Sequence, residues 1–297
     1  MLKLRFLLVS LITGFSALTA SALAGPNAVV IRVVTTFDYP GTGNSTTPFG
    51  INALGDVTGD YLDSAGVRRG FIRFHDGSFS PPIVDPNDDS NLTRGRGIND
   101  LGVVVGDYFG NNAYHGFILE NGTFTDYNIS EDVSTDLFGI NNAGDLSGGF
   151  GSAIQRNEGF IDIQGVVTAF AVPGNTATYA LGINNSDSVV GEGDSNFVAH
   201  GFLRRNGRLL YPIDFPGSIS TILNSINDNG WMVGSYNDSA GVTHGFVMIP
   251  PNTFVSFDYP GAAGTSLNGI NRKGLISARY ADDQGLRHGF LAQVRQR

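Results

Sequence analysis

The sequence contains no cysteine and almost no lysine, and both absences limit what the protein can be. Without cysteine there is no disulfide, no thiolate ligand for a metal and no cysteine nucleophile, so the fold depends on its core. Lys273 is the only lysine beyond residue 3, and the formal net charge is -9. An acidic surface repels phosphate backbones, so no nucleic-acid partner is expected.

Long hydrophobic runs are also absent, with one exception at the N-terminus. Residues 1–24 have the form of a secretory signal, with basic residues before the apolar run Phe6–Leu18 and a small-residue cleavage pattern at Ala22-Leu23-Ala24. The run is too short for a comfortable membrane span, although an uncleaved anchor is the alternative. The sequence therefore predicts a secreted protein, extracellular or periplasmic, with no stable membrane span after cleavage. Residues 25–297 are expected to form one domain.

Helical periodicity is missing from the rest of the chain, which instead carries six copies of one pattern. Gly97–Phe117, GINDLGVVVGDYFGNNAYHGF, shows the pattern. A Gly-Phe pair follows each Gly-Ile-Asn or Ser-Ile-Asn start by 19 or 20 residues. The copies begin near residues 50, 97, 139, 182, 225 and 269. Such a period predicts supersecondary units that need their neighbours to bury both faces.

Each copy has the pattern of four short strands. The first ends in Gly-Ile-Asn, the second is β-branched, and the third contains Gly-Phe. Asn-Gly or Asp-Gly hairpins lead to the fourth, which ends near Pro-Gly. Four strands in about 44 residues, repeated six times, predict an all-β fold, a six-bladed β-propeller of four-stranded blades. A β-solenoid is the alternative.

The two ends of the chain favour the propeller. The last copy stops without a fourth strand, while Val33–Gly41, VVTTFDYPG, closely matches Phe254–Gly261, FVSFDYPG, from the end of the preceding blade. We therefore expect a ring closed by the N-terminal strand, which completes the last blade. Closure removes the open strand edges of a linear stack, and a monomer is expected.

The repeated Gly-Ile-Asn-x-x-Gly-x-Val-x-Gly pattern followed by His-Gly-Phe resembles the extracellular HAF repeat family. The resemblance covers essentially the whole chain after the signal. The departures from the pattern are Ser225, Asp187, Ala278, Arg69 and Glu158. The resemblance implies a secreted repeat protein and assigns no activity to particular residues.

Two groups of side chains invite a metal-binding interpretation. His115, His200, His244 and His288 occupy one position in four copies, but equivalent positions in a propeller are spread around its axis, so bonds to neighbouring backbone are the expected role. Asp85, Asp88 and Asp89 lie in the longest insertion, Pro81–Arg96. They form either a Ca²⁺ site or a solvated acidic loop, because the spacing of an EF-hand is missing. No other cofactor is expected.

Function is expected where the copies differ, because the shared residues are explained by the fold. Two positions before each first-strand Ile the chain has Phe49, Arg96, Phe138, Leu181, Asn224 and Asn268. If this strand is innermost, Arg96, Asn224 and Asn268 bring polarity to the central channel; the alternative is that they bond the start of their own strand. Tyr39 and Tyr259 either stack on sugars or pack the blade junction.

The sequence contains no G-x-S-x-G, H-E-x-x-H or phosphate-loop motif, and no catalytic residue is predicted. The first hypothesis is a non-catalytic binding module with a glycan or protein ligand on the face of the inter-blade loops. One alternative is an extracellular polysaccharide hydrolase or lyase, with Asp85, Asp88 or Asp89 at the channel mouth. A structural envelope protein, with no pocket on that face, is another.

Overall fold

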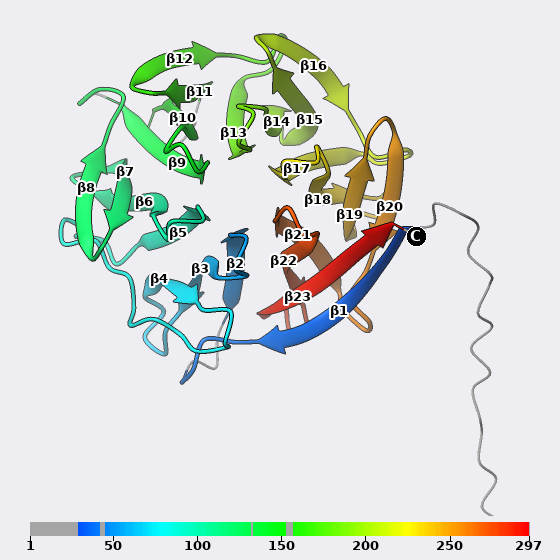
Figure 1. Ribbon diagram of the computed structural model, residues 1–297, viewed down its shortest axis with the longest axis horizontal. Coiled ribbons are helices and arrows are strands. Elements are labelled where there is room, and N and C mark those ends of the chain that lie inside the picture. The colour runs from blue at the N-terminus through cyan, green and yellow to red at the C-terminus, as the bar shows by residue number, and fades with distance from the viewer. Residues whose placement is uncertain (1–28, 42–44, 132, 153–156, 297) are drawn as a thin grey trace, which may run out of the picture.

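The computed structural model describes residues 29–41, 45–131, 133–152 and 157–296. The predicted signal, residues 1–24, lies outside them. The described residues contain strands, turns and bends but no helix. Twenty-three strands form six antiparallel sheets arranged around one axis (Figure 1). The predicted six-bladed β-propeller is confirmed.

Each blade is a meander that runs outward from the axis. The inner strands are β2 (Thr46–Ile51), β5 (Thr93–Ile98), β9 (Ser134–Ile140), β13 (Ala177–Ile183), β17 (Ser220–Ile226) and β21 (Gly264–Ile270). The second strands are β3 (Val57–Leu62), β6 (Val104–Gly110), β10 (Leu146–Gly151), β14 (Val189–Ser195), β18 (Met232–Asn237) and β22 (Leu275–Ala281). The third strands are β4 (Arg68–Arg73), β7 (Ala113–Glu120), β11 (Glu158–Ile163), β15 (Val198–Arg205), β19 (Thr243–Ile249) and β23 (Arg287–Gln296). Four outer strands follow their third strands directly: β8 (Thr123–Tyr127), β12 (Val166–Phe170), β16 (Arg208–Ile213) and β20 (Thr253–Phe257).

The ring is closed by the N-terminal strand, as the sequence predicts. Strand β1 (Val29–Phe37) pairs antiparallel with β23, and the order of the sixth sheet is β1-β23-β22-β21. Figure 1 shows the first and last strands of the chain side by side. The strand begins four residues before the expected Val33 and ends before the Asp-Tyr-Pro-Gly turn. The last blade is thus completed by the two ends of the chain together.

The first blade departs from four regular strands. Its sheet, β2-β3-β4, has three strands, and the fourth position is filled by residues 79–83. This segment makes two isolated bridges, Phe79 to Arg73 and Ile83 to Gly70. Between these bridges lie Pro81 and Pro82, which have no N–H to donate, so a continuous ladder cannot form here.

The Gly-Phe pairs supply the core of the blades. Their phenylalanines are all fully buried: Phe71, Phe117, Phe160, Phe202, Phe246 and Phe290. The second-strand glycine makes room for this ring, since a Cβ at Gly106 would lie 2.7 Å from the ring of Phe117. A second-strand glycine therefore accommodates the buried ring in five blades, and Ala278 takes its place opposite Phe290 in the last blade.

The asparagine of each Gly-Ile-Asn has two structural roles. In blade 4, the Oδ1 of Asn184 accepts hydrogen bonds from the N–H groups of Ser186 and Ser188, at 3.0 and 3.1 Å, which caps the turn. Its Nδ2 donates to the backbone oxygen of Asn227 in the next blade, at 3.0 Å. Every blade repeats this donation, through Asn52, Asn99, Asn141, Asn184, Asn227 and Asn271.

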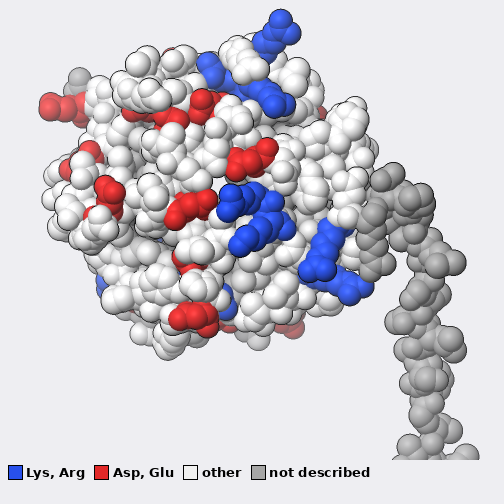
Figure 2. All heavy atoms as spheres, in the orientation of Figure 1, with Lys and Arg blue, Asp and Glu red and all other residues white. Residues whose placement is uncertain are grey.

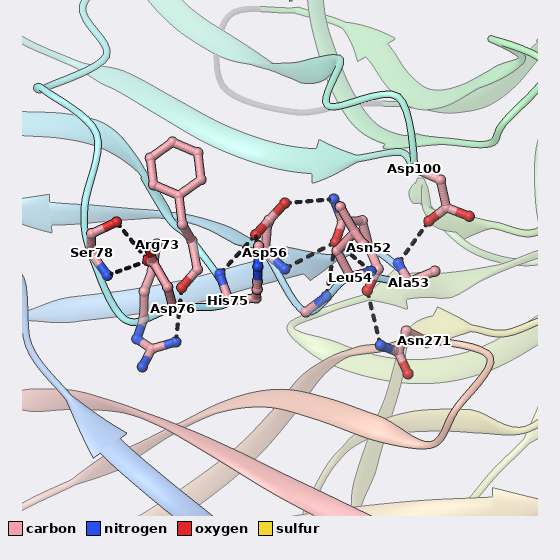
Figure 3. Close-up of polar contacts among 12 residues, drawn as sticks. Asn52, Ala53, Leu54, Asp56, Arg73, His75, Asp76, Ser78, Asp100 and Asn271 are labelled. Atoms are coloured by element: carbon pink, nitrogen blue, oxygen red, sulfur yellow. Dashed lines mark hydrogen bonds and ion pairs between the residues drawn. The ribbon is translucent and has the colours of Figure 1, made fainter.

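The six donations form a closed circle, which we call the asparagine ring. Its last link runs from the Nδ2 of Asn271 to the backbone oxygen of Asn52, at 2.9 Å. Figure 3 shows this link, together with the neighbouring bond from the Ala53 N–H to Asp100. The ring joins each blade to the next at the end of the inner strands.

Candidate functional site

Successive connections of an antiparallel meander alternate between the two ends of the propeller. The inter-blade loops and the loops between second and third strands lie at one end, which we call the loop end. The asparagine ring lies at the other. A cavity of about 240 Å³ lies on the axis, walled by the inner strands of all six blades. A smaller hollow of about 80 Å³ lies at the asparagine ring.

The wall of the central cavity combines apolar side chains with seven polar ones. The apolar part includes the isoleucines of the inner strands and two aromatic rings, Phe49 and Phe138. The polar side chains are Arg96, Asn224, Ser225, Ser235, Ser266, Asn268 and Arg279. The sequence prediction that Arg96, Asn224 and Asn268 face the channel agrees with this geometry.

Arg96 is held rigidly on the wall of the cavity. Its Nε donates to Asp107 at 2.9 Å, and its guanidinium lies 4.5 Å from the ring centre of Phe49 and 5.5 Å from that of Phe138. Arg94 donates through its own Nε to the other oxygen of Asp107, at 2.6 Å. Burial alone would raise the pKa of Asp107, but the two arginines outweigh it and lower that pKa. The buried carboxylate of Asp107 therefore pairs with both arginines, and Arg94 also lies 4.0 Å from Asp136.

Asn224 and Asn268 link neighbouring blades. The Nδ2 of Asn224 donates to the backbone oxygen of Leu267 at 2.9 Å, and the Nδ2 of Asn268 donates to that of Pro48 at 2.6 Å. Both acceptors belong to the next inner strand, whereas the structural alternative drawn from the sequence placed them at the start of the same strand. Asn268 Oδ1 also accepts from Ser266 at 2.7 Å. Among the described residues, no hydrogen bond to the Oδ1 of Asn224 is found, so this oxygen can accept one from a ligand.

Sequence reasoning missed Arg279, the second cation of the cavity wall. It follows Ala278 on β22, at a position that carries Asp60, Asp107 and Glu192 in other blades. In the first blade this position serves the scaffold, since Asp60 pairs with Arg68 at 2.6 Å. The change from an acidic to a basic side chain at this position was the signal in the sequence that pointed to a different role for Arg279.

Arg279 reaches the axis because its cross-strand partner is small. It lies opposite Ser266 on the inner strand, whereas Glu192 lies opposite Tyr179 and Asp107 opposite Arg94. Burial, with Arg287 nearby, lowers the pKa of Arg279 to about 10. The guanidinium is therefore charged at neutral pH although much of its water has been removed.

The cavity wall thus contains two arginines and no Asp or Glu, in a chain whose formal charge is -9. On the face shown in Figure 2, acidic and basic side chains are scattered and most of the surface is uncharged. The cavity lining, as far as it is described, does not hold the pair of carboxylates that a glycosidase requires. The arrangement can bind a small anion with hydroxyl groups.

Tyr39 and Tyr259 lie at blade junctions. The Tyr39 ring stacks on Tyr61 with centres 3.8 Å apart, and the Tyr259 ring stacks on Tyr280 at 3.9 Å. Neither tyrosine is part of the lining of the central cavity. The stacks correspond to the packing alternative weighed from the sequence, and a sugar-stacking role for the two residues stays a prediction.

The acidic insertion organises its own loop. Asp85 is buried and accepts from the N–H of Asn87 at 2.9 Å. Asp88 accepts from Leu92 N–H and Thr93 Oγ1, at 3.0 and 2.7 Å. Asp89 accepts from Asn111 N–H at 3.1 Å. Within the described ranges no group of three or more His, Cys, Asp or Glu is arranged to hold a metal ion, so the Ca²⁺ site stays a prediction without geometric support.

The strand-start histidines bond mainly to carboxylates rather than to the backbone expected from the sequence. The Nδ1 atoms of His200, His244 and His288 lie 2.9 Å from Asp214, Asp258 and Asp38, respectively. Only His115 contacts a backbone oxygen, that of Gly110 at 3.0 Å. These aspartates begin the segments that end in Pro-Gly, so the His and Asp of the repeat belong to one contact between the third and outer strands.

No family model matches the chain, and no curated protein matches it. Solved structures resemble it in fold. TolB from Acinetobacter baumannii has a TM-score of 0.55 at 13% identity, over 80% of this chain and 65% of TolB. A lectin of Aleuria aurantia, solved with Fucα1-6GlcNAc, has a TM-score of 0.54 at 9% identity, over 85% and 94% of the two chains. A putative gluconolactonase has a TM-score of 0.53 at 15% identity, over 91% and 94%.

These TM-scores support a shared propeller architecture. At such low identities, no activity of these proteins can be assigned to this chain. None of the described residues forms a helix with the length and apolar character needed to cross a membrane.

Proposed function

We propose that this β-propeller is a secreted, non-catalytic binding module whose glycan or protein ligand places a small group in the central cavity from the loop end. The observation that carries the proposal is the polar wall of this cavity. Arg96 and Arg279 face a space large enough for a small ligand, and each occupies a repeat position at which the six copies differ. The residues shared by the repeats are used in packing, capping and blade-to-blade bonds.

Binding fits this wall better than the two alternatives drawn from the sequence. A hydrolase or lyase needs an acid and a base beside the substrate, and the described lining offers no carboxylate. Asp85, Asp88 and Asp89, the candidates for that role, are engaged in loop contacts. An envelope spacer does not require a polar cavity on its axis.

Two further observations support the proposal. The predicted signal and the resemblance to the extracellular HAF repeat family favour secretion. The structural similarity to a lectin that was solved with Fucα1-6GlcNAc gives an example of a protein of similar fold that holds a glycan. At 9% identity it contributes the fold and no residue of the site.

The test is retention of ligand by the wild-type protein and by a variant with a filled cavity. Leu181 lies on the cavity wall, and Leu181→Trp would occupy the space with an indole. Leu210→Trp, on the exposed outer strand β16, is the matched control. On a glycan array and in a pull-down from secreted material, we expect wild type and Leu210→Trp to retain the same ligand and Leu181→Trp to lose at least nine tenths of it. Equal retention by all three proteins, or retention of nothing by wild type, would contradict the proposal.

A further inference from the structure

Arg279 is a charged, mostly buried side chain on the wall of the central cavity. Among the described residues, neither a hydrogen bond nor an ion pair joins its guanidinium to another protein group. The nearby charges are Asp60 and Arg287, and Asp60 is already bonded to Arg68 at 2.6 Å. A largely buried guanidinium normally has a paired anion, because the loss of water is otherwise not offset. Arg279 lines the central cavity, so a ligand can supply that anion.

Arg96 provides a comparison on the same wall. Its Nε is bonded to Asp107, and its ring contacts with Phe49 and Phe138 fix its plane. The two Nη groups of Arg96 make no hydrogen bond that is found within the described ranges. Arg96 is therefore preoriented and already paired with Asp107, whereas no hydrogen bond or ion pair of the Arg279 guanidinium is found among the described residues. An anion would be bound first by Arg279 and second by Arg96.

The uncharged part of the wall indicates what carries the anion. The Oδ1 of Asn224 can accept from a hydroxyl group, and Ser235 places a further hydroxyl on the wall. Isoleucine and leucine side chains, with the rings of Phe49 and Phe138, form the apolar remainder. The volume of about 240 Å³ lies below the roughly 300 Å³ at which pockets for drug-sized ligands begin, so one small ring fills it.

We propose that the cavity binds the carboxylate of a uronic acid, with Arg279 as the residue that recognises the carboxylate. This rests on the proposed function and names the chemical class of its ligand. The planar guanidinium of Arg279 matches a carboxylate in a two-point contact, and Asn224 and Ser235 take ring hydroxyls. The carboxylates of Asp60 and Asp107 lie near the two arginines and repel anions, so the site favours a ligand with one negative charge over a more highly charged one.

The test compares D-glucuronate with D-glucose, which has the same ring without the carboxylate. Calorimetric titrations would use wild type, Arg279→Gln and Arg208→Gln, the last being an exposed arginine of the outer strand β16. We expect wild type and Arg208→Gln to bind glucuronate at least tenfold more tightly than glucose. Arg279→Gln should lose at least tenfold for glucuronate and keep its affinity for glucose, and added salt should weaken glucuronate binding to wild type.

The Tm controls for folding of the variant, and a second variant tests the geometry of the guanidinium. Removing an unpaired, largely buried charge should leave the Tm unchanged or raise it, so Arg279→Gln is expected to fold. Arg279→Lys keeps the charge but loses the planar fork, and its affinity for glucuronate should fall between those of wild type and Arg279→Gln.

Three results would overturn the uronate assignment: no glucuronate binding by wild type, equal affinity for glucuronate and glucose, or unchanged glucuronate affinity in Arg279→Gln. D-glucose 6-sulfate serves as a further arm, and tighter binding of it than of glucuronate would also overturn the assignment. None of these results affects the cavity-filling test with Leu181→Trp. Failure of the uronate assignment is thereby distinguished from failure of the binding function.

Discussion

At the scale of single residues, the histidine–aspartate contacts make stability depend on pH. In the last blade, His288 Nδ1 lies 2.9 Å from Asp38 and its Nε2 lies 3.4 Å from Asp282. Burial alone would lower the pKa of His288, but the hydrogen bonds and charges of the two aspartates outweigh it and raise that pKa. His244, between Asp258 and Asp238, has a raised pKa for the same reason.

A raised histidine pKa stabilises the folded state only while the histidine is protonated. The contribution of His288 is fully present below its unfolded pKa of about 6.5 and is lost as the pH rises through the higher folded pKa. We therefore expect the free energy of unfolding of wild type to fall as the pH rises above about 6.5. In His288→Gln this fall should be smaller, and His244 should account for part of the remainder.

Urea unfolding at a series of pH values from 5.5 to 8.5 would measure this slope. Asp38→Asn serves as the companion variant, since it removes the anion and keeps the histidine. Both variants should show a flatter profile than wild type. A slope equal to that of wild type in both would show that the contact with Asp38 contributes nothing to the pH dependence.

At the scale of elements, the asparagine ring holds the inner strands together. Each ring asparagine both caps its own turn and donates to the next blade, as Asn184 does toward Ser186, Ser188 and Asn227. The cap was predictable from the sequence, because Asn in a turn bonds its own backbone. The bond to the next blade was not, because it joins residues 43 positions apart whose pairing no local pattern states.

Asn184→Ala should therefore destabilise the protein by about 2–4 kcal/mol, as three hydrogen bonds near the axis are lost and buried groups are left without partners. Denaturant unfolding would measure the change. Asn252→Ala is the matched control, because Asn252 is exposed in a hairpin turn, and its effect should stay within about 0.5 kcal/mol. A loss below about 1 kcal/mol for Asn184→Ala would contradict a stabilising role for the ring.

The first blade contains an element that the repeat pattern did not predict correctly, its fourth strand. The period predicts a fourth strand in every blade, and residues 79–83 occupy that place. Pro81 and Pro82 remove two donors from it, so only isolated bridges form. A repeat fixes the positions of elements, while the residues at each position decide whether a regular strand forms.

At the scale of the whole molecule, the ring depends on strand β1. This strand pairs with β23 along its length and covers the edge of the last blade. A chain that begins after Phe37 would expose the unpaired backbone groups of β23, which can pair with another chain. A chain that begins at Gly25 keeps the strand and removes only the predicted signal.

We expect the chain that begins at Gly25 to behave as a monomer and the chain that begins at Asp38 to associate and to have a lower Tm. Size-exclusion chromatography with light scattering, and thermal unfolding at two protein concentrations, would measure both effects. Monomeric behaviour and an equal Tm for the two chains would show that closure by β1 is dispensable.

The repeat pattern of the sequence predicts the propeller, the number of blades and the closure of the ring, and the structure confirms all three. Alternation along a strand also indicates which side chains of the first strand share a face, and this face lies on the axis provided that the first strand is innermost. Arg96, Asn224 and Asn268 were placed on the channel wall in this way.

Only the tertiary structure decided which of these side chains are still free to bind a ligand. It bonded Asn268 to Pro48, stacked Tyr39 on Tyr61 and left Arg279 facing the cavity without a protein partner among the described residues. This is because residues of neighbouring blades decide whether a polar side chain is already hydrogen-bonded or stacked within the protein. The distances and the space left by small residues such as Ser266 exist only in the closed ring.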